Sequence, residues 1–176
     1  VSEEASLGNA VGSLQDNDVI IGANAIGWPA GSIYGYNTDA NGNYLDHTGD
    51  GKIGAEDKVM LARTLPVCFG GFSTLLSWKG LSLDVQTDYA VGQKLLNMNR
   101  MLDDKANDVS DKYVEAADFF RLSRVSVCYD IPVKKHWLKK LTVSLTGTNL
   151  LIASPYSGFN PDVNSYSSPY SRGADY

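Results

Sequence analysis

The sequence predicts an all-β fold of antiparallel, up-and-down strands, forming part of a large transmembrane β-barrel. Several segments alternate apolar and polar residues, as strands do when successive side chains point to opposite faces. Short and long connections follow one another between these segments, and helical periodicity is nearly absent. One short helix is expected over Ala55–Thr64, directly after an acidic loop.

The alternation is clearest in Leu81–Val91, Arg124–Ile131 and Leu141–Thr148. It is less regular in Phe72–Trp78 and weaker still in Asp18–Ile26. One face of the expected strands is apolar and carries Leu81, Leu83, Val85, Val125, Val127, Leu141, Val143 and Leu145. The opposite face is polar and includes Asp84, Asp88 and Arg124, which are expected to line a wet lumen.

The connections favour a barrel. Lys79–Gly80 is a tight hairpin turn, and Pro132–Lys140 is also short. Long connections occupy Tyr36–Pro66, the polar stretch Gly92–Ala117, and the C-terminal stretch from Ser154. Short turns on one side and long loops on the other are the layout of an outer-membrane barrel.

A soluble antiparallel sandwich is the alternative, because it also alternates apolar and polar residues. Two details favour the barrel. Charged residues occupy the polar positions, as a wet lumen allows. Aromatic residues lie near the expected strand ends, as in an interfacial girdle: Trp78, Tyr89, Tyr129 and Trp137.

Composition excludes several classes. Apolar residues make up 43% and charged residues 20% of the chain, which is not the composition of a disordered segment. The net charge of -5 argues against nucleic-acid binding. No apolar run is long enough for a transmembrane helix. No catalytic motif is present, so no enzyme is expected. Cys68 and Cys128 are expected to be free thiols, and His47 and His136 are not expected to share a metal.

The acidic loop Asp46–Asp57 matches the EF-hand register at its first, fifth, sixth and twelfth positions. The expected Ca²⁺ ligands are Asp46, Thr48, Asp50, the Lys52 carbonyl and Asp57, with water completing the shell. Bound calcium would brace the loop. The alternative is a metal-free turn held by Asp and Gly residues.

The C-terminal stretch carries candidate ligand contacts. Its aromatic residues lie in a Ser- and Asn-rich sequence, a mixture typical of surfaces that contact carbohydrate or protein: Tyr156, Phe159, Tyr166 and Tyr170. The alternative is that these rings pack on neighbouring loops.

Four segments, in order, resemble the C-terminal barrel segment of the SusC/RagA family of TonB-dependent outer-membrane transporters of the Bacteroidetes. They are "GSIYGYNTDANGNYLDHTGDGKIGAEDKVML", "FGGFSTLLSWKGLSLDVQTDYAVGQ", "YVEAADFFRLSRVSVCYDIP" and "LTVSLTGTNLLIASPYSGFNPDVNS". The last is very close to the family's "GQNLLTFTKYSGYDPEV" signature.

The resemblance implies a segment truncated at both ends, from a barrel of about 22 strands around a plug. It implies import of oligosaccharides or peptides, energy from the TonB system through the missing plug, and a SusD-like surface lipoprotein as partner. The expected location is the outer membrane, in contact with its lipid, with extracellular loops. The alternative function is a soluble, calcium-braced β module that binds glycan or protein at the cell surface.

Four regions are expected along the chain. Residues 1–36 contain one weak strand, and residues 37–66 form an extracellular loop with the EF-hand-like turn. Residues 67–152 form about four antiparallel barrel strands. Residues 153–176 form a long extracellular loop before a missing last strand.

Overall fold

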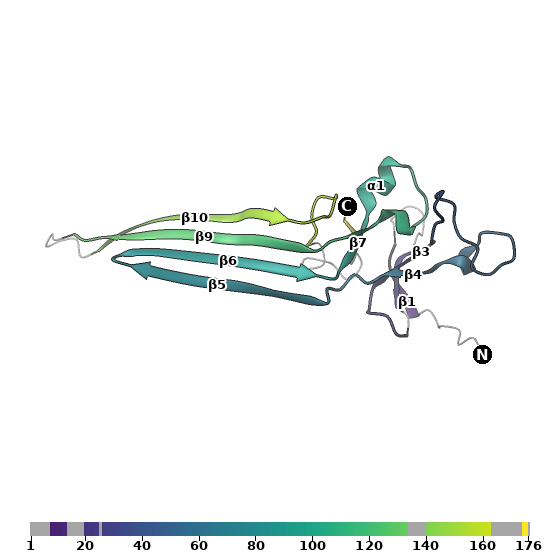
Figure 1. Cartoon of the computed structure of the whole chain (residues 1–176), viewed down its shortest axis with the longest axis horizontal. Helices are drawn as coiled ribbons and strands as arrows, with labels where there is room; N and C mark the ends of the chain where they lie inside the picture. The colour runs from purple at the N-terminus through teal and green to yellow at the C-terminus, as the bar shows by residue number, and fades with distance from the viewer. Residues whose placement is uncertain (1–7, 14–19, 25, 134–139, 163–173, 176) are drawn as a thin grey trace. The chain divides into compact units, whose positions relative to one another are not determined.

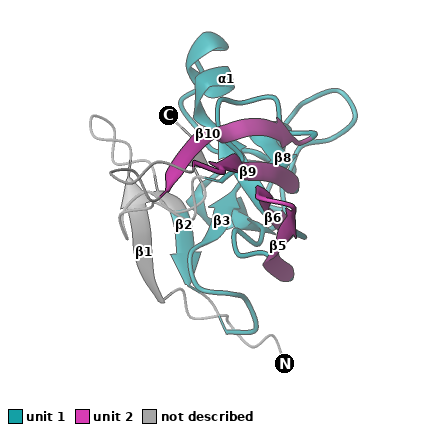
Figure 2. Cartoon of the chain, turned by 90° about the vertical axis from the view of Figure 1, so that its left-hand side faces the viewer, with its two compact units in different colours: residues 1–67, 91–118, 155–176 teal, residues 68–90, 119–154 magenta. Residues whose placement is uncertain are grey.

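The computed structural model describes residues 8–13, 20–24, 26–133, 140–162 and 174–175. The chain divides into two compact units, coloured separately in Figure 2. Unit 1 contains residues 1–67, 91–118 and 155–176, and unit 2 contains residues 68–90 and 119–154. Nearly all strand pairs are antiparallel, so the predicted antiparallel β fold is confirmed.

Unit 2 is a four-stranded sheet of long strands with the order β10-β9-β6-β5 (Figure 1). Its strands are β5 (Cys68–Trp78), β6 (Leu81–Val91), β9 (Phe119–Ile131) and β10 (Leu141–Ala153). β5 and β6 are joined by the predicted two-residue turn, where Lys79 has φ 46° and Gly80 has φ 87°. Positive φ at both positions fits the type I′ turn that joins twisted strands.

The strand register aligns the alternating residues in rows. Leu83 lies opposite Val127, which lies opposite Leu145. In the adjacent row, Asp84 lies opposite Ser126, which lies opposite Thr146. The period-two pattern of each separate strand therefore adds up to one apolar face and one polar face across the sheet.

A bulge interrupts this register near the end of the sheet that is remote from the Lys79 turn. Gln86 pairs with Arg124, but the next residue of β6 pairs with Leu122, which leaves Ser123 as an extra residue in β9. The matching step in β10 carries two extra residues, Asn149 and Leu150. Asn149 has φ 51°, a left-handed conformation that Asn tolerates better than most residues.

Unit 1 contains two sheets of short strands. The first has the order β1-β2-β3-β4, formed by Gly8–Ser13, Ile20–Asn24, Ser32–Gly35 and Val59–Ala62. The second has the order β11-β7-β8, formed by Ala174–Asp175, Lys94–Asn97 and Val114–Ala116. β11 pairs with β7 in parallel, so the end of the described chain returns to the middle of its sequence.

The α-helix α1 (Met98–Asp103) follows β7 directly and belongs to the core of unit 1. Its first turn is capped by Asn97, whose side chain accepts a hydrogen bond from the Arg100 backbone N–H at 3.1 Å. Met98 and Met101 face inward because residues three apart share one side of a helix. They pack in a buried cluster with Ile33, Ala62, Leu96, Val109 and Tyr113.

Two predictions need correction. Ala55–Thr64 does not form a helix of about two turns: only the 3₁₀ turn η1 (Ala55–Asp57) is present, and the following residues form β4. β4 pairs with β3, so sheet pairing overrides the helical propensity of this stretch. The segment before β9 is not simply a polar loop either, because it contributes β7, α1, the 3₁₀ turn η2 (Asp111–Tyr113), β8 and much of the core.

Candidate functional site

The apolar face of the four-stranded sheet is open to its surroundings. Leu145 is 77% exposed and Val143 is 56% exposed, although both lie in the interior of a long strand. The two buried apolar clusters of the described residues consist of unit 1 residues and include none from this face. Large exposed apolar surface marks a site of contact with a partner or with lipid.

The bulge preserves this apolar face. If Ser123 were a regular strand residue and not an extra one, strict alternation along β9 would turn Leu122 toward the polar face and Arg121 toward the apolar face. With Ser123 as the extra residue, Leu122 lies opposite Leu151 and Arg121 lies opposite Ile152. Nearby, the Leu150 side chain comes within 2.7 Å of where a Cβ on Gly147 would lie, so it fills the row where Gly147 has no side chain.

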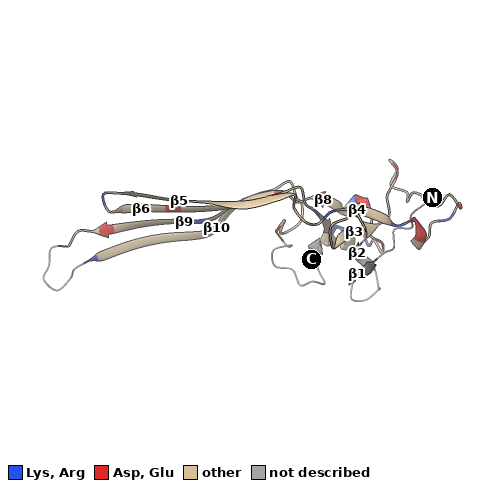
Figure 3. Cartoon of the chain, turned by 90° about the horizontal axis from the view of Figure 1, so that it is seen from below, with Lys and Arg blue, Asp and Glu red and all other residues tan. Residues whose placement is uncertain are grey.

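The opposite face carries the three residues predicted to line a lumen. Register places Asp84 opposite Ser126 and Arg124 opposite Gln86. Asp88 accepts a hydrogen bond from the Ser123 hydroxyl of the bulge. Figure 3 shows how sparse the charged residues are along these strands. The structure therefore brings Asp84, Asp88 and Arg124 to one face.

The polar face also carries apolar side chains: Ile152 lies on it, opposite Arg121, and β5 contributes Leu75. Ser77 of β5 is hydrogen-bonded to Ser82 of β6, with 3.2 Å between the hydroxyl oxygens, so both side chains lie on the polar face. Leu75, two residues before Ser77, shares that face by alternation and is exposed. The irregular pattern of Phe72–Trp78 in the sequence corresponds to this apolar residue on the polar side.

Both cysteines are free thiols and lie in different parts of unit 2. Cys128 pairs with Ser82, next to the Lys79 turn. Cys68 begins β5, and its sulfur lies 3.9 Å from the Tyr89 hydroxyl near the other end of β6. The sheet register thus keeps the two thiols apart.

The acidic loop is organised around two carboxylates. Asp57 accepts hydrogen bonds from the backbone N–H groups of His47, Thr48 and Gly54 at 2.8–3.0 Å. Asp46 accepts from the Gly49 and Gly51 N–H groups at 2.5 and 2.8 Å and from the Thr48 hydroxyl at 3.1 Å. Gly49 and Gly51 have φ 76° and 80°, which suits glycine and lets the chain turn around Asp46.

These hydrogen bonds stabilise the ionised carboxylates. The Gly54 N–H, followed by the Thr48 N–H, lowers the pKa of Asp57 below its ordinary value. The Gly51 and Gly49 N–H groups lower the pKa of Asp46 in the same way. The loop wraps Asp57 so closely that the residue has no exposed surface. The loop itself lies at the surface with few other protein atoms around it, so solvent still screens the charge of this carboxylate.

The predicted calcium ligands therefore lie in one loop, but their oxygens already accept backbone hydrogen bonds. Asp50 accepts from the Lys52 N–H at 2.8 Å. Among the described residues, no group of three or more His, Cys, Asp or Glu side chains is arranged to hold a metal ion. Each carboxylate oxygen has a second lone pair, so calcium binding by this loop stays a prediction.

A second polar centre, absent from the sequence predictions, surrounds Glu115 of β8. One carboxylate oxygen accepts from the Ser157 backbone N–H at 3.0 Å, and both accept from its hydroxyl at 2.7 and 2.9 Å. The Asn97 amide and the Arg100 guanidinium each donate to the same carboxylate at 3.3 Å. Glu115 thus ties β7, the start of α1 and the 155–162 segment together.

Glu115 is partly shielded from solvent. Burial raises the pKa of its carboxyl, but the hydrogen bonds from Ser157, Arg100 and Asn97 oppose this effect, and the net result is a lowered pKa. The group is therefore ionised at neutral pH and holds its donors as charge-assisted hydrogen bonds.

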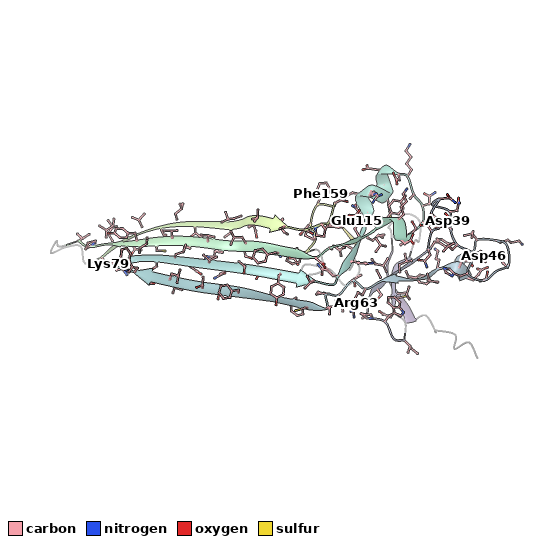
Figure 4. All side chains as sticks on the ribbon, viewed as in Figure 1. Asp39, Asp46, Arg63, Lys79, Glu115 and Phe159 are labelled. Atoms are coloured by element: carbon pink, nitrogen blue, oxygen red, sulfur yellow. The ribbon has the colours of Figure 1, made fainter. Side chains whose placement is uncertain are left out.

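Beside this centre lies a pocket of about 290 Å³ within unit 1. It is lined by Asn97, Asn99, Arg100, Asp103, Ser157, Gly158 and Phe159. Glu115 and Phe159 are labelled in Figure 4. Phe159 is 82% exposed, whereas the Asn99 side-chain nitrogen is buried and has no hydrogen-bond partner within the described part of the chain.

The predicted aromatic contacts have different outcomes. Phe159 lines the pocket with its ring exposed. Tyr156 is buried and packs with Leu95 and Ala117, so for this residue the alternative of packing on neighbouring parts of the protein holds, and not ligand contact. Tyr166 and Tyr170 lie outside the described residues, as do Trp137 and His136.

The fold and the two-faced sheet define the class of this chain: an antiparallel β protein whose long strands present an uncovered apolar face. No helix in the described residues is long and apolar enough to cross a membrane. No protein-family model matches the chain.

A curated relative and several solved structures are similar to this chain. The chain is 29% identical to the TonB-dependent receptor P26 of Formosa agariphila, over 70% of this chain and 16% of that receptor. Its fold matches the solved structures of the RagAB peptide transporter (TM-score 0.66, 24% identity) and of the RagAB peptide importer in the closed-closed state (TM-score 0.64, 23% identity). Each match covers 96% of this chain and 23% of the other.

The chain therefore spans between a sixth and a quarter of the length of these relatives. Together the sequence and fold matches confirm its resemblance to a segment of a SusC/RagA-type TonB-dependent transporter.

Proposed function

We propose that this chain forms part of the wall and the extracellular loops of a TonB-dependent outer-membrane importer of oligosaccharides or peptides. The observation that carries the proposal is the register of unit 2, which aligns apolar residues from neighbouring strands on one uncovered face. In a transmembrane barrel, that face contacts lipid and the opposite face lines the lumen. A soluble sandwich would instead bury its apolar face against a second sheet.

The long strands would be the wall, and unit 1 would be built from extracellular loops. A plug domain, which couples to the TonB system, and a SusD-like surface lipoprotein over the extracellular mouth complete the proposal. Its support is the similarity to a TonB-dependent receptor and to RagAB, whose structures are described as those of a peptide importer. In such an arrangement Asp84, Asp88 and Arg124 contact water in the lumen.

The test is the environment of single spin labels in the complete transporter, reconstituted in lipid after all of its native cysteines, Cys68 and Cys128 included, are changed to serine. Labels at Leu83 and Val127 should be accessible to oxygen, which dissolves in hydrocarbon. Labels at Asp84 and Ser126 should instead be accessible to a water-soluble nickel complex. Equal accessibility at both pairs of positions would contradict the wall assignment.

Transport is tested separately, by the uptake of labelled oligosaccharides and peptides into cells with and without a working TonB system. Uptake that needs both this protein and the TonB system supports import and identifies the substrate class. Unchanged uptake of every substrate after deletion of the protein would contradict it.

A further inference from the structure

We propose that the pocket lined by Asn97, Asn99, Arg100, Asp103, Ser157 and Phe159 binds one neutral sugar ring of an oligosaccharide. The inference deepens the proposed import function, on which it rests, by assigning a subsite and a ligand class. Its starting point is the combination of an exposed aromatic ring with several convergent polar groups, which is the usual composition of a small-molecule site.

The buried amide of Asn99 points to a ligand acceptor. Asn99 is a lining residue of the pocket, and its side-chain nitrogen is buried without a hydrogen-bond partner within the described residues. A buried donor left unpaired is unfavourable by about 1–3 kcal/mol. The neighbouring Asn97 is fully used, because its amide donates to Glu115 and Ser157 and its oxygen accepts from the Arg100 N–H. Asn99 is therefore the amide that remains available.

The pocket also holds both signs of charge. Arg100 donates to Glu115 through one nitrogen, and its side chain is half exposed, so other guanidinium N–H groups face solvent. Asp103 is exposed at the other end of α1 and can only accept hydrogen bonds when ionised. The carboxylates of Asp103 and Glu115 disfavour an anionic ligand, and Arg100 disfavours a cationic one.

A sugar hydroxyl matches this set because it donates and accepts at once. It can accept from Asn99 or Arg100 and donate to Asp103. A peptide carbonyl would also satisfy Asn99, and a peptide N–H could donate to Asp103, so the choice of a sugar rests on the exposed flat ring of Phe159. The volume of about 290 Å³ suits a single ring.

Phe159 provides the flat apolar surface for that ring. The Phe159 side chain is 82% exposed, so most of its apolar ring surface is open to a ligand. The segment that carries it is nevertheless fixed, because Ser157 is held by Glu115 and Tyr156 is buried. An exposed ring on a fixed segment is preorganised for stacking, since little conformational freedom is lost on binding.

The experiment uses the complete transporter in detergent, applied to an array that carries neutral oligosaccharides, acidic oligosaccharides and peptides. The wild type should bind neutral oligosaccharides. The affinity for those ligands, measured by calorimetry, should fall at least about tenfold in Phe159→Ala and in Asn99→Leu, in line with the loss of a ligand hydrogen bond or a stacking contact.

The control is Ile26→Ala, because Ile26 is also 82% exposed, belongs to the same unit and does not line the pocket. Its affinity should stay within about twofold of wild type. Asn99→Leu keeps the branched outline of the side chain and removes no hydrogen bond of the side-chain nitrogen within the described chain, so its melting temperature should not fall. That readout separates loss of a ligand contact from loss of folding.

Three results would overturn the inference: no neutral oligosaccharide bound by the wild type, unchanged affinity in both pocket variants, or binding of peptides alone. The failure can be separated from failure of the import proposal. If the spin labels still report a lipid face while the array is negative for sugars, the wall assignment stands and only the sugar subsite is rejected.

Discussion

Glu115 accepts hydrogen bonds from both the backbone N–H and the hydroxyl of Ser157, which lies 42 residues further along the chain. Between these two residues the chain leaves unit 1, forms β9 and β10 in unit 2, and returns. The pair therefore fixes the two ends of this hairpin to each other.

Replacing Glu115 with Ala should loosen the 155–162 segment. The substitution removes the acceptor for Ser157, Asn97 and Arg100, and hydrogen bonds of this kind contribute about 1–3 kcal/mol each. Hydrogen exchange of the Ser157 amide in the complete protein should become faster. Glu56→Ala, at an exposed acidic residue of the same unit, should leave that amide unchanged.

The same contact should weaken in acid. The folded pKa of Glu115 lies below its ordinary value of 4.5, so its stabilising contribution is complete above that pH and is lost as the pH falls through the lower folded value. Protection of the Ser157 amide, corrected for intrinsic exchange, should decline over that range in the wild type. In Glu115→Gln the decline should be absent; an equal decline in both proteins would assign it to other groups.

Calcium should protect the acidic loop. If Asp46–Asp57 binds Ca²⁺ with a Kd of about 10⁻⁴–10⁻³ M, as extracellular modules do, exchange of its amides should slow over that concentration range. Asp46→Asn should abolish the effect. Asp39→Asn is the matched control, because Asp39 also accepts backbone N–H groups, from Asn41 and Asn43, in a neighbouring turn. No difference between calcium and EDTA in the wild type would leave the loop as a metal-free turn.

The two faces of the sheet should respond differently to one substitution. Leu145→Arg places a charge on the apolar face and should destabilise the barrel by about 2–4 kcal/mol near the bilayer midplane. Ser144→Arg, one residue earlier on the polar face, should change stability far less. Urea unfolding in lipid vesicles measures both. A larger loss for Ser144→Arg would mean that the faces are exchanged.

The bulge should depend on the backbone conformation of Asn149. With φ at 51°, Asn149→Val should cost about 1–2 kcal/mol, while Asn149→Gly should be tolerated. Thr148→Val tests a β-branched residue at the neighbouring position, which pairs regularly with Arg124. Equal losses for both valine variants in the same unfolding assay would show that the left-handed conformation is not the cause.

The sheet could be predicted because each strand carries its own period-two pattern. The bulge was not predicted, although a signal for it is present: Arg121 and Arg124 are an odd number of residues apart, so strict alternation cannot place both on the polar face. Unit 1 was harder to predict. Its core joins residues distant in sequence, such as Ile33 and Met98, and its strands are too short to show a period.

The candidate pocket shows the same limit. Phe159 was singled out because aromatic residues in polar loops are conspicuous, but its partners on α1 were not. Nothing local in "NMNR" distinguishes Asn97, which is bonded to Glu115, from Asn99, whose amide is unpaired within the described residues. Their roles depend on a contact with a segment about 60 residues away. A tertiary contact of that length leaves no periodic signal.

The extra residues at the bulge accumulate across the sheet: none in β6, one in β9 and two in β10 at the same height. At this level β10 contains the most residues and β6 the fewest, so the sheet bends within its own plane, with β10 on the outer side of the bend. Such a wall tolerates many exchanges of one residue for another, but it should not tolerate a change in length. Removing a regularly paired residue of β9, such as Val125, would turn the side chains on one side of the deletion to the opposite face and bring Arg121 to the apolar face.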